Sequence, residues 1–343
     1  MIYVHVPFCG SFCTYCDFYS ELLCLPAAAE VYTDELCAEA ERRKEEIRAS
    51  QEVNTLYIGG GTPSVLPLSC LGRIAGQLRS YVDSDFEEFT VEVNPEDIVR
   101  KGTSYVRGLL DAGVNRVSMG VQSMDDGMLR WMNRRHDSSK ALQAFDILRK
   151  AGVGNISLDL IFGISHMTDD MLPDTVRRFV ELRPEHISAY QLSIEEGSAL
   201  AGLVSEGKYE EASDEQCSRQ YGLICRELGK AGYVHYEISN WARPGYEAVH
   251  NSAYWSRRPY VGLGPGAHSL TMPPFSKDGQ QRSWNSQELS GWTSSREILS
   301  PEEIREEEIM LGLRTLKGWN GRRLSEDEWF ISDSIISDIL AQS

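Results

Sequence analysis

The chain opens with the stretch Met1-Ile-Tyr-Val-His-Val-Pro-Phe-Cys9-Gly-Ser-Phe-Cys13-Thr-Tyr-Cys16-Asp-Phe18. Residues 3–6 predict a short buried strand, and Pro7 ends it. Three cysteines follow in a C-x3-C-x2-C spacing on the loop that leaves this strand. A short loop can turn three thiolates toward one point, which suits a metal cluster. Three ligands would leave one iron of a cubane 4Fe-4S cluster without a protein ligand, so that this iron could bind a small molecule.

Two other interpretations of these cysteines stay open from spacing alone. A disulfide with one spare thiol would need an oxidising compartment, which nothing in the sequence indicates. A zinc site would need a fourth ligand from Asp17 or His5, at a spacing unusual for structural zinc. We interpret Cys9, Cys13 and Cys16 as ligands of an iron–sulfur cluster.

Length and charge limit the classes of protein to which this chain could belong. The 343 residues predict one large and one smaller domain, which we place at residues 1–200 and 201–343. The formal net charge of −17 argues against a nucleic-acid duplex as a main partner. We find neither a signal peptide nor an apolar run near the roughly 18 residues that span a bilayer, and we therefore expect a cytoplasmic protein. We assign no function to the cysteines that lack ligand spacing, which are Cys24, Cys37, Cys70, Cys217 and Cys225.

Strands and helices alternate after the cysteine loop. A helix is predicted at residues 27–47, and further strands are predicted at 53–58, 89–95, 116–121, 156–162 and 186–192, with helices between them. Such alternation predicts a parallel sheet, and six units can curl into a partial barrel rather than a closed eight-stranded one. We therefore expect an α/β fold, a partial (β/α)6 TIM-like barrel with a smaller, mixed and mainly helical C-terminal domain.

Polar residues fall where the predicted strands end. Gly59-Gly60-Gly61 follow the strand at 53–58 and permit close approach of a ligand to the backbone, with a bare tight turn as the alternative. At or near the ends of the next three strands stand Glu92, Gln122 and Asp159. Ligands bind at the carboxyl ends of parallel strands, so this arrangement favours one shared ligand. For each carboxylate the alternative is a core salt bridge to Arg116 or Arg134.

At the cysteine loop the chain resembles the radical S-adenosylmethionine (SAM) superfamily. The sequences Tyr-Val-His-Val-Pro-Phe-Cys and Tyr-Cys-Asp-Phe are similar to the branch that holds oxygen-independent coproporphyrinogen III oxidase and the HemW family of heme chaperones. The resemblance covers roughly residues 1–320 and implies a 4Fe-4S cluster, SAM and an electron donor. By matching motifs it implies contacts with SAM at Tyr3, Tyr15, Gly61, Thr62 and Glu92. In the oxidase, a cavity for a second SAM is lined at the positions of Gln122, Arg134 and Asp159.

Two features separate the members of this branch. The oxidase carries a fourth cysteine where this chain has Phe18, and it carries a segment before the cluster strand, with which this chain begins. Both departures resemble the heme chaperones, as does the motif His250-Asn-x-x-Tyr-Trp255. The resemblance implies a protein that binds heme and delivers it to a recipient protein. His250 is the first candidate for a heme ligand and His268 the second, and a packed, hydrogen-bonded His250 is the alternative.

Two enzyme hypotheses stand beside the chaperone. The first is the oxidase itself, which acts in porphyrin biosynthesis. The second is a radical SAM enzyme with another substrate, because Ser165-His166-Met167 replaces the Pro-Gly-Gln that usually follows the Asp159 strand. The chain also ends early for this family, so residues 333–343 are expected to be a shortened part of a C-terminal unit.

Overall fold

The computed structural model describes residues 1–23 and 25–341, so Cys24 and the last two residues lie outside the described part. Within that part the central sheet has nine strands, in the order β11-β1-β4-β5-β6-β7-β8-β10-β9. Six neighbouring strands run parallel in chain order: β1 (Ile2–Val6), β4 (Thr55–Gly60), β5 (Glu88–Val93), β6 (Arg116–Gln122), β7 (Ile156–Phe162) and β8 (His186–Gln191). They confirm the predicted partial (β/α)6 barrel, which stays open because β11 and β9 form separate edges.

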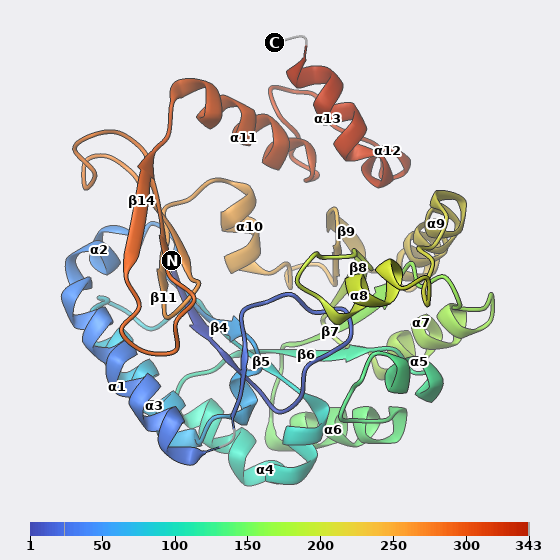
Figure 1. Cartoon of the computed structure of the whole chain (residues 1–343), viewed down its shortest axis with the longest axis horizontal. Helices are drawn as coiled ribbons and strands as arrows, with labels where there is room; N and C mark the ends of the chain where they lie inside the picture. Colours follow the sequence, from blue (N-terminus) through green and yellow to red (C-terminus); the bar gives the residue numbers. More distant parts are fainter. Residues whose placement is uncertain (24, 342–343) are drawn as a thin grey trace.

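Helices cover the outer face of the sheet (Figure 1). In the part of α4 after a kink at Gly102, the buried residues Tyr105, Val106 and Leu109 recur at helical spacing, so burial of one apolar stripe holds this helix on the sheet. Asn94 caps it by accepting the N–H of Glu96 at 3.0 Å. The helices of this region are α1 (Pro26–Arg42), α2 (Lys44–Ala49), η1 (Pro63–Val65), α3 (Leu68–Arg79), α4 (Pro95–Asp111), α5 (Asp126–Trp131), α6 (Ser138–Ala151), α7 (Met171–Leu182), α8 (Ala199–Ser205) and α9 (Asp214–Lys230).

The helix predicted at residues 27–47 is divided into α1 and α2. Arg43 lies between them with φ −102° and ψ 14°, outside the helical region. Its guanidinium group binds Glu39 at 3.0 Å and Glu46 at 2.8 Å, and it donates to the carbonyl oxygen of Gly262 at 2.7 Å. The bend is thus anchored to a strand far away in the sequence, which local helical periodicity could not reveal.

C-terminal strands extend the sheet at both edges, which the sequence does not predict. These strands are β9 (Val234–Glu237), β10 (Asn240–Ala242) and β11 (Val261–Leu263). β11 pairs parallel with β1, and β10 pairs antiparallel with β8. A separate antiparallel sheet is formed by β12 (His268–Thr271), β13 (Gln281–Asn285) and β14 (Ser294–Ile298).

The smaller C-terminal region also contains helices, and the last three of them lie at the top of Figure 1. They are α10 (Val249–Trp255), α11 (Pro301–Leu313), α12 (Glu326–Phe330) and α13 (Ser332–Leu340). The region is therefore mixed, as expected, with more strand than the sequence indicates. The boundary at residue 200 stays a prediction. Among the described helices, none has both the length and the apolar character that crossing a bilayer requires.

Candidate functional site

The loop of residues 7–20, called the cysteine loop below, lies at the carboxyl ends of the barrel strands. Its two ends are joined by the short parallel strands β2 (Phe8–Cys9) and β3 (Glu21–Leu22). In its middle, the Thr14 N–H donates to the Met132 carbonyl oxygen at 3.1 Å, and the Thr14 carbonyl oxygen accepts the Leu200 N–H at 2.8 Å. Contacts with residues distant in sequence therefore hold the thiols in place.

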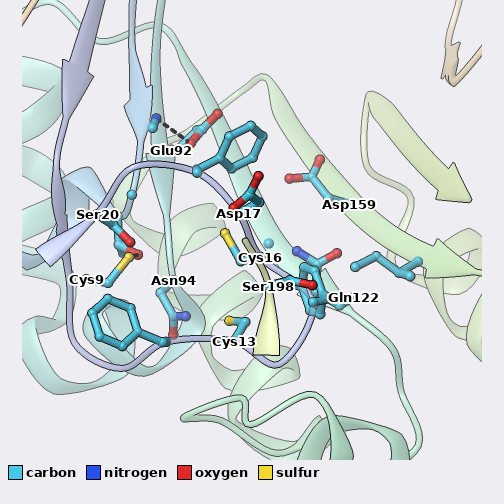
Figure 2. A pocket seen from close by; sticks show the side chains of 18 of the residues that line it. Cys9, Cys13, Cys16, Asp17, Ser20, Glu92, Asn94, Gln122, Asp159 and Ser198 are labelled. Atoms are coloured by element: carbon cyan, nitrogen blue, oxygen red, sulfur yellow. Dashed lines mark hydrogen bonds between the residues drawn. The ribbon is translucent and has the colours of Figure 1, made fainter. Parts of the chain in front are cut away.

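The cysteine loop and the strand ends enclose a cavity of about 1220 Å³ (Figure 2). Most of the predicted site residues line it: Cys9, Cys13, Tyr15, Cys16, Gly61, Thr62, Glu92, Gln122, Arg134 and Asp159. The structure thus brings site residues from six segments of the chain together around one cavity. Tyr3 and His250 are not among the lining residues.

The three thiols are spaced more widely than the ligands of a single metal ion. A tetrahedral zinc ion would hold sulfur ligands within about 3.8 Å of one another. Among the described residues, Cys9, Cys13 and Cys16 do not form a group with ligand atoms within 4.8 Å of one another. His5, considered as a fourth zinc ligand, instead has its Nδ1 3.0 Å from the Tyr3 hydroxyl and its Nε2 2.9 Å from the Tyr19 carbonyl oxygen. The seven described cysteines are all free, so no disulfide is formed among them.

Burial determines the protonation state of the thiols on the cysteine loop when no metal is bound. Burial raises the pKa of Cys9, and it raises the pKa of Cys16 to about 11. The neutral thiols are therefore the stable form without metal, and metal binding would displace their protons. Arg134 donates to the sulfur of Cys13 at 3.3 Å, and the Cys9 sulfur lies 3.5 Å from the Thr62 hydroxyl.

The glycine turn after β4 receives the cysteine loop. Gly60 has a φ of 105°, a backbone conformation that residues other than glycine rarely adopt. A Cβ on Gly61 would lie only 2.6 Å from the Phe8 carbonyl oxygen. The N–H groups of Gly61 and Thr62 donate to the carbonyl oxygens of Val6 and Phe8 at 2.8 and 2.7 Å. The sequence predicted that a ligand would approach this backbone closely. At Gly61 the chain segment that carries Cys9 makes that close approach instead.

Glu92 is a buried carboxylate that faces the cavity from β5. It accepts hydrogen bonds from the Tyr57 hydroxyl at 2.6 Å and from the Gly60 N–H at 3.2 Å. Burial raises its pKa to about 7, against the effect of the Tyr57 hydrogen bond. Within residues 1–23 and 25–341, neither Glu92 nor Asp159 forms a salt bridge, so the alternative of a paired core carboxylate fails for both. A buried carboxylate that lines a cavity and has no ion-pair partner is suited to a cationic ligand.

Three further polar side chains face the same cavity. Asp159 accepts the Ser118 hydroxyl at 3.2 Å, and burial raises the pKa of Asp159. Gln122 has a φ of 71° at an irregularity in the pairing of β6 with β7. In the described part of the chain, the buried Oε1 of Gln122 and the buried Nε of Arg134 have no hydrogen-bond partner. Unpartnered buried polar atoms are costly, so these groups fit a polar ligand that would satisfy them.

Tyr3 and His250 occupy the neighbouring core. The Tyr3 hydroxyl contacts His5, as described above. His250 lies on α10 with 1% of its surface exposed; its Nδ1 is 2.8 Å from the Thr55 hydroxyl and its Nε2 is 3.1 Å from the Tyr254 hydroxyl. Burial lowers the pKa of His250 to about 3. This is the geometry of the packed, hydrogen-bonded alternative, and the heme-ligand role of His250 stays a prediction.

His268 differs from His250 because it is exposed. It begins β12, and its ring centroid lies 6.3 Å from that of Trp284 in a stacked arrangement. It therefore remains accessible to a ligand.

The sequence analysis missed the ion pair that supports the cysteine loop. Asp97 is fully buried and accepts both terminal nitrogens of Arg135, at 3.0 and 2.8 Å, and the Ser64 hydroxyl at 2.9 Å. The Arg135 guanidinium lies so close to Gly10 that a Cβ there would be 2.7 Å from it. The Arg134-Arg135 pair was the available signal, but the carboxylate partner is 38 residues away.

Removing this carboxylate should destabilise the protein strongly. We expect Asp97→Ala to lower the free energy of unfolding by about 3–5 kcal/mol, because it leaves Arg135 largely buried without its partner. Burial opposes ionisation, but the hydrogen bonds from Arg135 and Ser64 prevail and lower the pKa of Asp97. This stabilisation is therefore present above the unfolded-state pKa of 3.8 and lost as the pH falls below it. Urea denaturation at several pH values measures both effects.

Asp34 offers a matched control for this substitution. It pairs with Arg73 at the surface, where the two side chains are 66% and 46% exposed. Asp34→Ala should cost less than about 1 kcal/mol. An equal loss in the two variants would contradict a special role for Asp97.

Fold and site together define a class of protein. A partial barrel of parallel strands carries three free thiols on the first loop, above a glycine turn and buried polar groups at the strand ends. This is the architecture of the radical SAM proteins. The family model described as "Radical SAM superfamily" matches residues 3–179.

Curated relatives place the chain more narrowly. It is 34% identical over 318 residues to the heme chaperone HemW of Lactococcus lactis, covering 92% of this chain and 82% of the relative. It is 31% identical to HemW of Bacillus subtilis, covering 98% of this chain and 89% of the relative. The chain therefore belongs to the HemW family within the radical SAM superfamily.

A solved structure supports the fold. The coproporphyrinogen III oxidase of Escherichia coli, described as a radical SAM enzyme, superposes with a TM-score of 0.75 at 23% identity. The match covers 92% of this chain and 75% of the oxidase. At this identity the likeness concerns the fold.

Proposed function

We propose that this protein is a radical SAM-type heme chaperone, which binds a 4Fe-4S cluster, SAM and heme and passes heme to a recipient protein in the cytoplasm. The observation that carries the proposal is the similarity of nearly the whole chain to curated heme chaperones. A reductant for the cluster and a recipient for the heme are the partners that this function requires.

Different residues of the cavity would bind the cluster and SAM. Cys9, Cys13 and Cys16 would hold the cluster and leave one iron for SAM. When bound, such a cluster supplies the electron that cleaves a sulfur–carbon bond of SAM. Glu92 would orient the positively charged end of SAM, and the tight loop-to-turn contacts at Gly61 would limit the access of water.

The mouth of the cavity has an apolar character that suits heme. Phe12 and Phe18 both line the cavity, yet 49% and 71% of their surfaces are exposed. Exposed aromatic side chains beside a cavity favour an apolar ligand or partner. Phe18 occupies the position at which the resemblance to the oxidase would require a cysteine.

We expect the protein to bind heme and not to decarboxylate coproporphyrinogen III. Heme binding is measured by titration of the full chain, followed by visible absorption. Decarboxylation is measured with the reduced, cluster-reconstituted protein, SAM and coproporphyrinogen III. Decarboxylated product without heme binding would overturn the chaperone and establish the oxidase. Neither activity would favour a radical SAM enzyme with another substrate.

The heme ligand can be assigned in the same assay. If His250 leaves its two hydrogen bonds to bind iron, His250→Ala should alter the heme absorption spectrum. An unaltered spectrum would show that another residue binds the heme iron. His268→Ala would then be the next variant, because His268 is exposed.

A further inference from the structure

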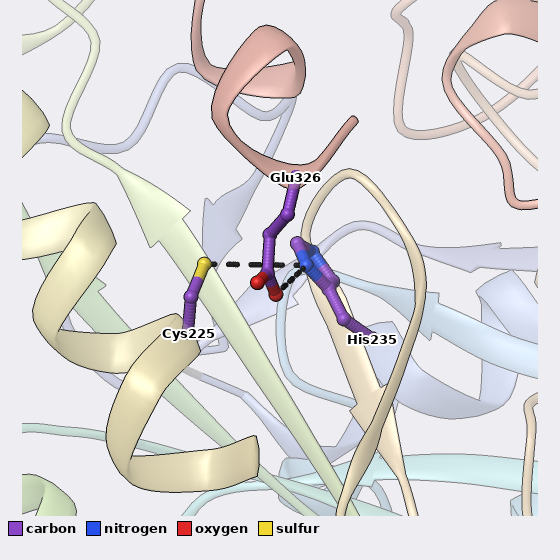
Figure 3. A group of neighbouring side chains, drawn as sticks. All are labelled: Cys225, His235 and Glu326. Atoms are coloured by element: carbon purple, nitrogen blue, oxygen red, sulfur yellow. Dashed lines mark hydrogen bonds and ion pairs between the residues drawn. The ribbon is translucent and has the colours of Figure 1, made fainter. Parts of the chain in front are cut away.

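A cluster of metal-binding side chains lies outside the cavity, where three distant segments meet. Cys225 comes from α9, His235 from β9 and Glu326 from the first turn of α12 (Figure 3). One ligand atom from each lies within 4.8 Å of the others, and in the described part of the chain no other group of three such residues does so. The His235 Nδ1 is 2.8 Å from Glu326 Oε1 and 4.0 Å from the Cys225 sulfur.

These distances suit a metal ion between the three side chains. Zinc bonds of about 2.3 Å to sulfur and about 2.0–2.2 Å to nitrogen and oxygen place tetrahedral ligand atoms about 3.3–3.8 Å apart. The sulfur–nitrogen distance of 4.0 Å lies slightly above this range, and the nitrogen–oxygen distance of 2.8 Å lies below it. Small side-chain rotations would therefore complete the three-ligand arrangement.

The imidazole is oriented as metal-bound histidines are. Its Nε2 donates to the Ile238 carbonyl oxygen at 3.3 Å, which leaves Nδ1 to face Cys225 and Glu326. Metal-binding histidines ordinarily donate their second nitrogen to a carbonyl or carboxylate in this way. The ring is stacked 3.9 Å from Trp241 at 11°, and it meets Trp329 edge-on at 4.5 Å. Two fully buried tryptophans thus fix its position.

Two other interpretations of the cluster fit less well. A thiol–imidazole–carboxylate relay would place the thiol and the carboxylate on opposite ring nitrogens, whereas here the same Nδ1 faces both. A plain His235–Glu326 ion pair leaves the thiol unexplained. A bound cation would accept the thiolate of Cys225 as a ligand.

We propose that Cys225, His235 and Glu326 bind one divalent transition-metal ion of the zinc type, with water as the fourth ligand. Mixed sulfur, nitrogen and oxygen ligands suit this borderline-soft ion. The Glu326 side chain is 49% exposed, so the ion can enter from solvent and keep a water ligand. The ion would join α12 to α9 and to the strand at the edge of the barrel, and would stabilise the C-terminal region.

The proposal is tested in the full chain carrying Cys9→Ala, Cys13→Ala and Cys16→Ala, which removes the proposed cluster ligands. Co²⁺ titration should give one equivalent bound, with the ultraviolet charge-transfer absorption of a thiolate ligand, and Zn²⁺ should displace it. Cys225→Ser should remove that absorption. Glu326→Gln changes a half-exposed side chain and should fold normally, yet it should weaken binding by about tenfold or more.

Cys217→Ser is the matched control, because Cys217 is a buried thiol on the same helix. It should leave the Co²⁺ spectrum unchanged. Zn²⁺ should also raise the midpoint of thermal unfolding, and Glu326→Gln should remove that rise while leaving the metal-free midpoint near that of its parent. No thiolate absorption with Co²⁺, or equal absorption after Cys225→Ser, would overturn the proposal.

Discussion

Replacing Cys9, Cys13 and Cys16 together by alanine is expected to abolish iron–sulfur cluster assembly. After anaerobic reconstitution, the variant should lack the broad visible absorption of thiolate-bound clusters and should retain almost no iron. The physical reason is that the three thiols supply every protein ligand proposed for the cluster. The loop itself is held by backbone contacts such as those of Thr14, so it should keep its course in the variant.

Two cysteines outside the cavity supply the control. Cys37 and Cys70 are free thiols that do not line it, so Cys37→Ala and Cys70→Ala should reconstitute normally. Full iron content in the triple variant would refute the assignment of the cluster to the cysteine loop.

Glu92→Gln should weaken SAM binding about ten- to a hundredfold while the cluster stays intact. Charge-assisted hydrogen bonds contribute roughly 1.5–3 kcal/mol, which corresponds to this range of affinity. Glutamine keeps the shape and can still accept the Tyr57 hydroxyl, so the change removes mainly the charge. Calorimetric titration of SAM into the reconstituted protein measures the loss.

Glu195→Gln is the comparison variant, because Glu195 lines the same cavity but is exposed. It should bind SAM as the wild type does. If Glu92→Gln binds SAM with unchanged affinity and has a normal iron content, Glu92 has only a structural role.

The pH dependence of SAM binding follows from the raised pKa of Glu92. With that pKa at about 7, the affinity for cationic SAM should increase as the pH rises from 6 to 8 and the carboxylate ionises. Glu92→Gln should flatten the profile. In the ligand-free protein the sign for stability is opposite. The native state binds the proton more tightly than the unfolded state, so the free energy of unfolding falls as the pH rises from 4.5 toward 7.

Most of the barrel could be predicted because its signals are local. Alternating strand and helix patterns located the six units, and β7 has the predicted bounds of residues 156–162. The strands that extend the sheet, β9, β10 and β11, are only three or four residues long. Their pairing depends on the sheet already present, so no local pattern predicts them.

The site was predictable as a set of residue types but not as a set of contacts. Glu92 and Asp159 were visible as carboxylates within apolar strands. That neither is paired with an arginine became clear only from the packing. The same holds for His250, whose motif suggested a ligand and whose surroundings instead occupy both ring nitrogens.

By itself, the sequence determined the parallel barrel, the three-cysteine loop and the strand ends at which polar residues gather, because each depends on periodicity or spacing within a short segment. Only the tertiary structure decided that Asp97 supports Arg135 beside the loop, that His250 is buried in hydrogen bonds, and that Cys225 meets His235 and Glu326. These are contacts between residues 10 to 195 positions apart in the sequence. Their geometry follows from how the elements pack, and packing is a property of the whole chain rather than of any stretch within it.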